Sequence, residues 1–395
     1  MLTSSKNPLI QRTFGYYFLF MCLGLNMAIT GPTLPALATQ TNSRLGQMGL
    51  LFLASSIGYT VGTLISGRIF DRARGHLVLG IAQLFVAAML VLIPFTPWLW
   101  LLLVILVCMG VAGGFINTGG NILMTWTHGE KVGPFMNALH FFFGLGAFLS
   151  PLLIAQVIGV AGGYRWGYWI LAIIATLVGL RMMTTAGNPR PSFAQDGETV
   201  RSVGPIPVAL IIACMLFFFF YVGAEIAFGG WIYTYAITLN LADIVMAAYL
   251  NSAFWLAFTI GRLFSIPIAT RFTPKQVILT ALLSSLAVLI LGMMFANSST
   301  VLWLMVIGLG FCMAPVYATG FTLAGQSIAL TGMLTSIILL GDSLGGMVLP
   351  SVVGQVIEST GAQAMVYLIF GSLVLNLLAF FGILRLRPAE PSQSS

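Results

Sequence analysis

Long apolar runs, separated by short polar or Pro/Gly-containing stretches, fill almost the whole chain. A transmembrane helix needs roughly 20 mostly apolar residues, and about twelve of the runs are long enough. In the first part of the chain the runs predict helices at 13–38, 46–70, 76–95, 98–126, 133–159 and 165–185. In the second part they predict helices at 206–237, 244–270, 275–296, 299–325, 330–357 and 362–385. The pattern therefore predicts an all-α polytopic membrane protein with twelve transmembrane helices.

Composition supports a membrane protein and excludes a soluble enzyme. Hydrophobic residues make up 59% of the 395 residues and charged residues 6%, whereas soluble domains carry roughly 25% charged residues. So few charges leave too little polar surface to cover a water-facing globule. The four cysteines each lie inside an apolar run without metal-ligand spacing. We expect them to pack as small apolar residues, with no bound metal.

The longest polar stretch divides the chain into two parts with six predicted helices each. It predicts an N-terminal six-helix bundle over 1–187, a linker over 188–205, and a C-terminal six-helix bundle over 206–395 that ends in a short tail. The two parts repeat each other at an offset of 199 residues, which superposes 24–31 on 223–230 and Gly62 on Gly261. Such a repeat predicts two pseudo-symmetric bundles with a binding site at their interface, and it pairs Asn26 with Glu225.

Positive charges predict the orientation, because cytoplasmic loops retain an excess of Lys and Arg. The side of the termini and the linker holds most of the basic residues, whereas the opposite loops hold only Arg44 and Arg165. We therefore expect both termini and the linker in the cytoplasm, and a multi-pass protein in the cytoplasmic (inner) membrane of the cell. The formal charge of +7 is then a topology signal, and no nucleic-acid partner is expected.

The end of the second predicted helix combines a small residue with an acid and neighbouring arginines. Gly67, Asp71, Arg72 and Arg74 lie within a stretch that resembles the loop signature between helices 2 and 3 of the major facilitator superfamily. An acid beside arginines can bond across an interface in one conformation and release it in another. The resemblance implies that these four residues form a conformational latch; the alternative is that the charges serve topology alone.

Three further stretches, at 110–121, 137–151 and 221–231, resemble the fucose–galactose–glucose:proton symporter group, in particular its sodium-dependent-glucose-transporter-like branch. The resemblance covers nearly the whole chain. It implies the major facilitator fold and the ion-coupled symport of a sugar or similar polar solute. Asn26 and Asn117 stand where members of the group carry acids. The first half therefore lacks the coupling carboxylates that the group would supply there.

Two acids lie deep inside predicted helices, where a charged side chain costs roughly 2.5–3.5 kcal/mol even on insertion scales. Glu225 shares a helix face with Tyr221, and in the superfamily this helix lines the central cavity. Glu225 is therefore the leading candidate for binding a proton or accepting substrate hydroxyls, against a structural role within its own half. Asp342 is the second candidate; because its helix lies at the interface of the halves in the superfamily, a gate or packing role is the alternative.

Polar and aromatic residues elsewhere in the apolar runs complete the candidate site. His140 is expected at the depth of Arg262, where a neutral His140 would accept a hydrogen bond from Arg262 or an acid would lie between the two. Asn117 and Asn121, four residues apart, share a helix face, and amides suit hydroxyl-rich solutes. The remaining candidates, each of which taken alone is more often a helix–helix contact, are Asn26, Asn251, Trp255, Trp231 and Tyr317.

These residues favour a secondary active transporter of a sugar or similar small polar solute, coupled to protons or sodium and otherwise without a cofactor. We expect a monomer whose partners are its solute and the lipid bilayer. The alternative is an exporter of an apolar or cationic compound, to which the phenylalanines at 141–143 and 217–220 would contribute. A membrane-embedded enzyme is disfavoured because the three histidines are scattered, and an ATP-driven pump because no P-loop occurs.

Overall fold

The computed structural model describes residues 8–161, 163–185, 187, 189, 207–327 and 332–387, and their regular structure is helical throughout. The helices of the N-terminal half are α1 (Pro8–Ala28), α2 (Thr30–Gln40), η1 (Leu45–Met48), α3 (Gly49–Arg72), α4 (Gly75–Leu92), η2 (Ile93–Phe95), α5 (Leu99–His128), η3 (Gly129–Lys131), α6 (Val132–Ala161) and α7 (Arg165–Met183). The helices of the C-terminal half are α8 (Val208–Thr238), α9 (Ile244–Ala269), α10 (Pro274–Met294), α11 (Ser299–Met313), α12 (Val316–Ser327), α13 (Gly332–Thr360) and α14 (Ala364–Leu386). The predicted linker at 188–205 lies outside the described residues apart from Pro189.

The described chain holds 11 helices that are long and apolar enough to cross a membrane, and the bent pair of α1 and α2 makes up to 12 spans. This confirms the predicted multi-pass architecture. The predicted helix at 13–38 is in fact broken by a bend of 47°. Pro32 explains the break, because it has no N–H for the carbonyl of Ala28 and its ring crowds that carbonyl. Pro315 stands in the same way at the break between α11 and α12.

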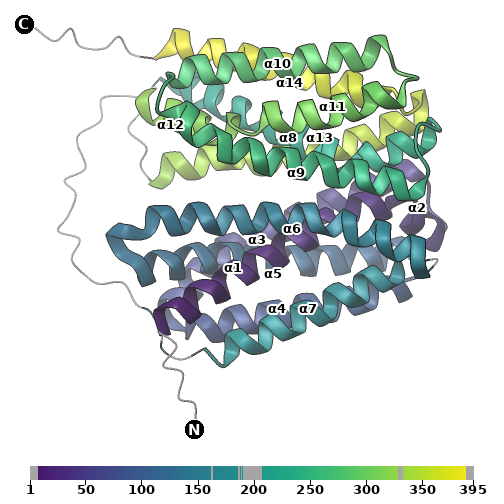
Figure 1. Ribbon diagram of the computed structural model, residues 1–395. Coiled ribbons are helices and arrows are strands. Elements are labelled where there is room, and N and C mark those ends of the chain that lie inside the picture. Colours follow the sequence, from purple (N-terminus) through teal and green to yellow (C-terminus); the bar gives the residue numbers. More distant parts are fainter. Residues whose placement is uncertain are drawn as a thin grey trace, which may run out of the picture.

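The helices form two bundles that lie one above the other in Figure 1, and corresponding pairs pack in each. In the N-terminal half α3 packs on α5, α1 on α6 and α4 on α7; in the C-terminal half α9 packs on α11, α8 on α13 and α10 on α14. The halves meet chiefly where α6 packs on α9 and α3 on α13. Both described ends of the chain lie at one end of the bundles, which we call the terminal end; the opposite end, where α2 finishes, is the far end (Figure 1).

The repeat extends to individual backbone contacts between helices. A Cβ at Gly62 would lie 2.1 Å from the carbonyl oxygen of Val111, and a Cβ at Gly261 would lie 2.8 Å from that of Phe311. A glycine is required at both positions because each helix backbone approaches its neighbour so closely. The two glycines are related by the predicted offset of 199 residues, so the same helix crossing is built twice.

The first helix of each half follows a slightly different offset. Asn42 (φ 47°) and Asn240 (φ 54°) adopt the left-handed conformation in the turns that follow α2 and α8, and Asn is one of the few residues that tolerate it. The same three backbone hydrogen bonds close both turns, at positions 198 residues apart. The counterpart of Glu225 is therefore Met27, one residue beyond the predicted Asn26.

Candidate functional site

A cavity of about 390 Å³ lies between the two halves and brings together most of the predicted site. Its walls come from α1, α2, α3, α5 and α6 on one side and from α8, α9, α12 and α13 on the other. Small-molecule sites typically have volumes of about 300–1,000 Å³, so the cavity fits a solute of sugar size. The predicted residues that line it are Asn26, Asn117, His140, Glu225, Trp255, Tyr317 and Asp342.

The wall from the C-terminal half carries the charges. Glu225 of α8 is 8% exposed, and its Oε1 lies 4.0 Å from Nη2 of Arg262 of α9. The guanidinium of Arg262 also stacks 4.5 Å above the ring of Phe258. On α12 and α13, the hydroxyl of Tyr317 donates a 2.8 Å hydrogen bond to Oδ2 of Asp342. Two carboxylates and one guanidinium thus face the same cavity.

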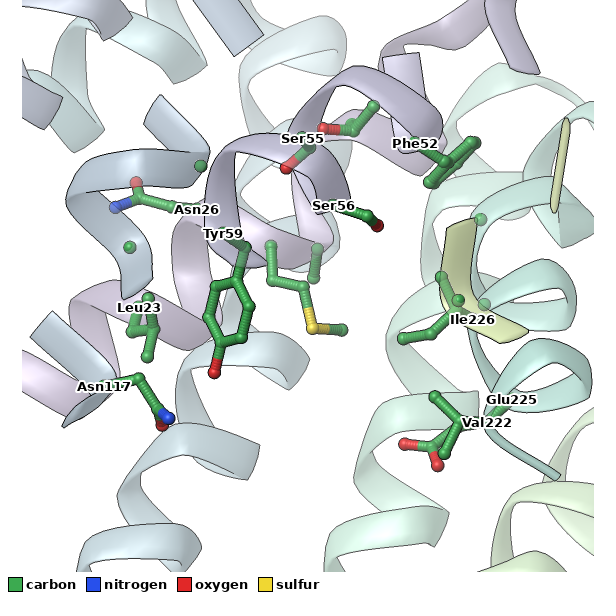
Figure 2. Close-up of a pocket in the computed structure, with 18 of the residues that line it drawn as sticks. Leu23, Asn26, Phe52, Ser55, Ser56, Tyr59, Asn117, Val222, Glu225 and Ile226 are labelled. Carbon is green, nitrogen blue, oxygen red and sulfur yellow. The ribbon is translucent and has the colours of Figure 1, made fainter. Parts of the chain in front are cut away.

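The wall from the N-terminal half is polar but uncharged if His140 is neutral. Figure 2 shows Asn26, Tyr59 and Asn117 on this side of the cavity and Glu225 on the other. Nδ2 of Asn26 has no hydrogen-bond partner among the described residues, and Nε1 of Trp255 on the opposite wall has none either. A buried donor without a partner loses free energy. Both donors belong to residues that line the cavity, but each nitrogen atom is itself buried, so a side-chain movement must expose it before it can bind a solute.

His140 lines the cavity from α6, where its ring meets the edge of Phe20 at 5.8 Å between centroids. Arg262 lines the same cavity, as the matching depth of the two residues predicts. Its described ion pair is with the acid Glu225. The sequence leaves two arrangements open: an acid that pairs with Arg262, or a neutral His140 that accepts a hydrogen bond from it. The observed ion pair between Arg262 and Glu225 is closer to the first.

Four predicted site residues do not line the cavity, because their polar atoms bind backbone carbonyls instead. The hydroxyl of Tyr221 donates to the carbonyl of Met313 at 2.9 Å, which lies at the end of α11 and has no partner within that helix. The other donors are Nε1 of Trp231 to Pro350 at 2.9 Å, Nδ2 of Asn251 to Gly229 at 2.5 Å, and Nδ2 of Asn121 to Asn117 at 2.8 Å. Each of these contacts joins helices or turns of one helix.

The sequence-based prediction missed the hydroxyl groups of α3 that line the cavity. Ser55, Ser56, Tyr59 and Thr60 all contribute to its wall. Ser55 with Tyr59, and Ser56 with Thr60, are four residues apart and so lie on neighbouring strips of one helix face. The sequence did contain a signal for this wall of the cavity, because four hydroxyl groups occur within six residues of an otherwise apolar run.

The far end of the cavity is closed by contacts between the halves. The backbone N–H of Gly46 donates to Oε2 of Glu358 at 2.9 Å, and the hydroxyl of Ser351 donates to the carbonyl of Gly49 at 2.9 Å. Closer to the cavity, the rings of Phe52 and Trp231 lie 6.3 Å apart. Residues of α13 and α8 thus seal against η1 and α3.

The predicted latch lies at the terminal end of α3 and is not engaged. Asp71, Arg72 and Arg74 are exposed, and within the described part of the chain no ion pair of Asp71 is found. A Cβ at Gly67 would meet nothing within 4 Å. In this conformation Gly67 is therefore not a point of close helix approach.

Two six-helix bundles around a polar cavity that is sealed at one end define a membrane transporter rather than an enzyme. Residues 16–338 match the Major Facilitator Superfamily, and the chain belongs to that family. It is 32% identical over 375 residues to the sodium-dependent glucose transporter 1A of Mus musculus, with 86% of this chain and 88% of that protein covered. Identity to the sodium-dependent glucose transporter 1 of Homo sapiens is 30% over 370 residues, with 85% and 71% covered.

The fold is also similar to that of a solved transporter structure. A bacterial homolog of the human lysosomal transporter Spinster, in an inward-facing and unoccupied conformation, superposes with a TM-score of 0.76 at 12% sequence identity. The match covers 98% of this chain and 100% of that chain. The family resemblance and the fold class predicted from the sequence are thereby confirmed.

Proposed function

We propose that this protein is a secondary active transporter that moves a sugar or similar small polar solute across the cytoplasmic membrane by alternating access, coupled to protons or sodium. The observation that carries the proposal is the cavity between the halves, with amides and hydroxyls on one wall and two carboxylates on the other. Amide and hydroxyl groups both donate and accept hydrogen bonds, as a hydroxyl-rich solute requires. Carboxylates supply groups that can bind a coupling cation.

The relatives support the same substrate class and one of the two cations. Two sodium-dependent glucose transporters are 32% and 30% identical to this chain, and the similarity spans most of both chains. On the basis of these relatives and of the polar cavity, we propose that this protein also transports glucose-type solutes. Because one chain encloses the whole cavity, we further propose that the monomer is the working unit.

Alternating access is the mechanism that the two ends of the molecule support. If the termini are cytoplasmic, the seal formed by Glu358 and Ser351 faces outward and the conformation is inward-facing. Closing the terminal end would then bring Asp71 and Arg72 into an interface that they lack here. Under this proposal, Asp71→Asn slows turnover more than it weakens solute binding, since Asp71 lies far from the cavity. An equal loss of binding and turnover in a folded variant would argue against a latch.

The alternative, an exporter of apolar or cationic compounds, has less support from the cavity. Phe217 and Phe218 are buried inside the C-terminal half, and of the two phenylalanine runs the cavity lining includes only Phe143. The lining does include Phe20 and Phe52, so an aromatic surface is present for either kind of solute.

A binding and uptake screen of the purified, reconstituted protein tests the proposal. The panel contains monosaccharides, nucleosides, amino acids and hydrophobic cations, each at two pH values and with sodium or choline as the main cation. We expect a monosaccharide to raise the melting temperature and to be taken up against its gradient. Stabilisation by hydrophobic cations alone would favour the exporter.

A further inference from the structure

The cavity is lined by more carboxyl groups than basic groups, and one carboxylate has no cationic partner among the described residues. The described lining holds two carboxyl groups, those of Glu225 and Asp342, and one guanidinium, that of Arg262. The uncharged groups that can titrate on the elements facing them are Tyr59 on α3, His140 on α6 and Tyr317 on α12. With both carboxyl groups ionised and His140 neutral, the cavity holds one negative charge in excess.

Glu225 already has a counter-charge. Arg262 lies at 4.0 Å from it, in the same half of the protein, and its guanidinium is held over Phe258. Glu225 is also the more buried of the two acids. A cation that bound Glu225 would have to compete with a guanidinium that is always charged and covalently tied in place.

Asp342 has a hydrogen-bond donor but no cation. The hydroxyl of Tyr317 donates to its Oδ2 at 2.8 Å, which leaves Oδ1 for another ligand. Among the described residues, no nitrogen of Lys, Arg or His lies within the 4.0 Å that defines an ion pair with this carboxylate. The hydroxyls of Ser343 and Tyr59 line the same cavity and add oxygen atoms of the kind that hard cations bind.

We propose, on the basis of the transporter function proposed above, that Asp342 and not Glu225 loads the coupling cation, either a proton or a sodium ion. The cation neutralises the excess negative charge before the terminal end closes over the cavity. A lone charge in a closed, membrane-embedded cavity is costly, so loading favours the change of conformation. Glu225 and Arg262 remain paired, and face the solute.

The position of Asp342 in the fold fits this role. It lies on α13, the helix of the C-terminal half that packs against α3 of the N-terminal half. The same helix carries Ser351 and Glu358, which seal the far end. A change of charge at Asp342 therefore acts on one of the helices that join the two halves, whereas Glu225 lies on a helix bound mainly to α13 and α14 of its own half.

The first test measures cation binding without any solute. The melting temperature of the purified full-length protein is compared in sodium chloride and choline chloride at equal ionic strength, and at two pH values. We expect the wild type to respond to sodium or to pH, Asp342→Asn to lose that response, and Asp342→Glu to retain it with a shifted midpoint. The double variant Glu225→Gln/Arg262→Gln, which removes both members of the pair, should keep the response.

The second test separates coupling from solute movement in proteoliposomes, with D-glucose as the probe. At one cation per uncharged solute and without a membrane potential, a tenfold cation gradient sustains at most about tenfold accumulation. We expect Asp342→Asn to lower the accumulation ratio to about 1 while glucose exchange across the membrane continues. The gradient that drives accumulation in the wild type, of pH or of sodium, identifies the cation.

The outcomes distinguish failure of this inference from failure of the proposed function. If glucose neither binds nor moves but Asp342→Asn still abolishes the cation response, the solute class is wrong and the cation site stands. A cation response or accumulation that survives in Asp342→Asn overturns the inference. So does a wild type that responds to neither cation, or a response that the double variant loses and Asp342→Asn keeps.

Discussion

The two walls of the cavity come from one repeated bundle, yet the described carboxylates and guanidinium of the cavity belong to only one wall. The repeated contacts relate α1 to α8 at an offset of 198 residues, α3 to α9 and α6 to α13 at 199, and α5 to α11 at 200. Counterparts at these offsets are Met27 and Glu225, Thr63 and Arg262, Asn117 and Tyr317, and Phe143 and Asp342. Each charged residue that lines the cavity from the C-terminal half thus corresponds to an uncharged one in the N-terminal half.

The difference shows which part of the repeat is constrained by packing and which is available for chemistry. Glycines at helix crossings are shared because a side chain there would collide with a backbone carbonyl, whatever the protein transports. Side chains that face the cavity meet solute and water, so the two halves can differ there without disturbing the bundles. We infer a division of labour in which the uncharged wall binds the solute and the charged wall responds to the cation.

The largest expected effect comes from breaking the shared packing. Gly62→Ala places a Cβ 2.1 Å from a carbonyl of α5, and Gly261→Ala places one 2.7 Å from the Cβ of Ala314. Overpacking costs about 1–3 kcal/mol and sometimes more, and we expect Gly62→Ala at or above the top of this range and Gly261→Ala below it. Fluorescence-detected size-exclusion chromatography after heating measures the surviving fraction.

Gly67→Ala is the matched control for both glycine variants, since nothing lies within 4 Å of the added Cβ. It should be as stable as the wild type or slightly more so, because Ala favours the helix. If Gly261→Ala behaves like Gly67→Ala, the helix crossing is not under the same constraint in the two halves.

The second prediction removes the positive charge of the charged wall. Breaking a buried ion pair costs about 3–5 kcal/mol, but the side chain of Arg262 is 34% exposed and its distance to Glu225 is 4.0 Å. We therefore expect Arg262→Gln to lower transport by about 10- to 100-fold, equivalent to about 1.4–2.8 kcal/mol. Initial uptake rates in proteoliposomes measure the loss.

Two further variants sharpen the reading of Arg262. Adding Glu225→Gln should recover part of the loss, because no unpaired carboxylate remains. Thr63→Ala, at the counterpart position, should change little, since Oγ1 of Thr63 has no described hydrogen-bond partner. A large effect of Thr63→Ala would show that the position matters in both halves and not the charge.

The fold could be predicted from the sequence to within a few residues at most helix ends, because the length of each apolar run is set by the thickness of the membrane. The breaks after Ala28 and after Met313 were missed, since an apolar run continues through Pro32 and Pro315 although the helix does not. The register of the first repeat was wrong by one residue for a similar reason: matching glycines align the sequences, but backbone contacts fix the structural equivalence.

The candidate site was predicted less completely than the fold, because residue type does not reveal which carbonyl lies nearby. Tyr221 and Glu225 do share a helix face, yet the hydroxyl of Tyr221 is taken by Met313 at the end of α11. Tyr59 was overlooked because a tyrosine in a membrane helix is common and its direction is not encoded locally. Only the packed bundle shows that Tyr59 faces the cavity while Asn251 binds a neighbouring helix.

The third prediction tests the uncharged wall. Asn26→Ala removes a buried donor that has no described partner, from a residue that lines the cavity. A hydrogen bond is worth about 0.5–1.5 kcal/mol, so the dissociation constant of the solute should rise by about 2- to 12-fold. Isothermal titration calorimetry measures the affinity, and the accumulation ratio at saturating solute should stay the same.

Asn121→Ala is the matched control, because Asn121 binds the carbonyl of Asn117 in its own helix and does not line the cavity. It should leave the affinity unchanged. A loss of accumulation in Asn26→Ala at full solute occupancy would contradict the division of labour between the walls.

The smallest expected effect concerns the far-end seal. Its carboxylate, that of Glu358, belongs to the C-terminal half, as the charged residues of the cavity do. Oε2 of Glu358 accepts from the N–H of Gly46 at 2.9 Å, while Arg44 lies 3.9 Å from Oε1 and its side chain is 82% exposed. A hydrogen bond to a charged group is worth about 1 kcal/mol more than one between neutral groups. Glu358→Gln should thus shift the population toward far-end opening by about fivefold, whereas Arg44→Gln should change it little, because exposed ion pairs contribute about 0–1 kcal/mol.

The labelling rate of Ser56→Cys, in a background without the four native cysteines and with an impermeant thiol reagent added at the far side, reports the opening. A larger effect of Arg44→Gln than of Glu358→Gln would mean that the seal depends on the N-terminal half, and that the asymmetry of charge is confined to the cavity.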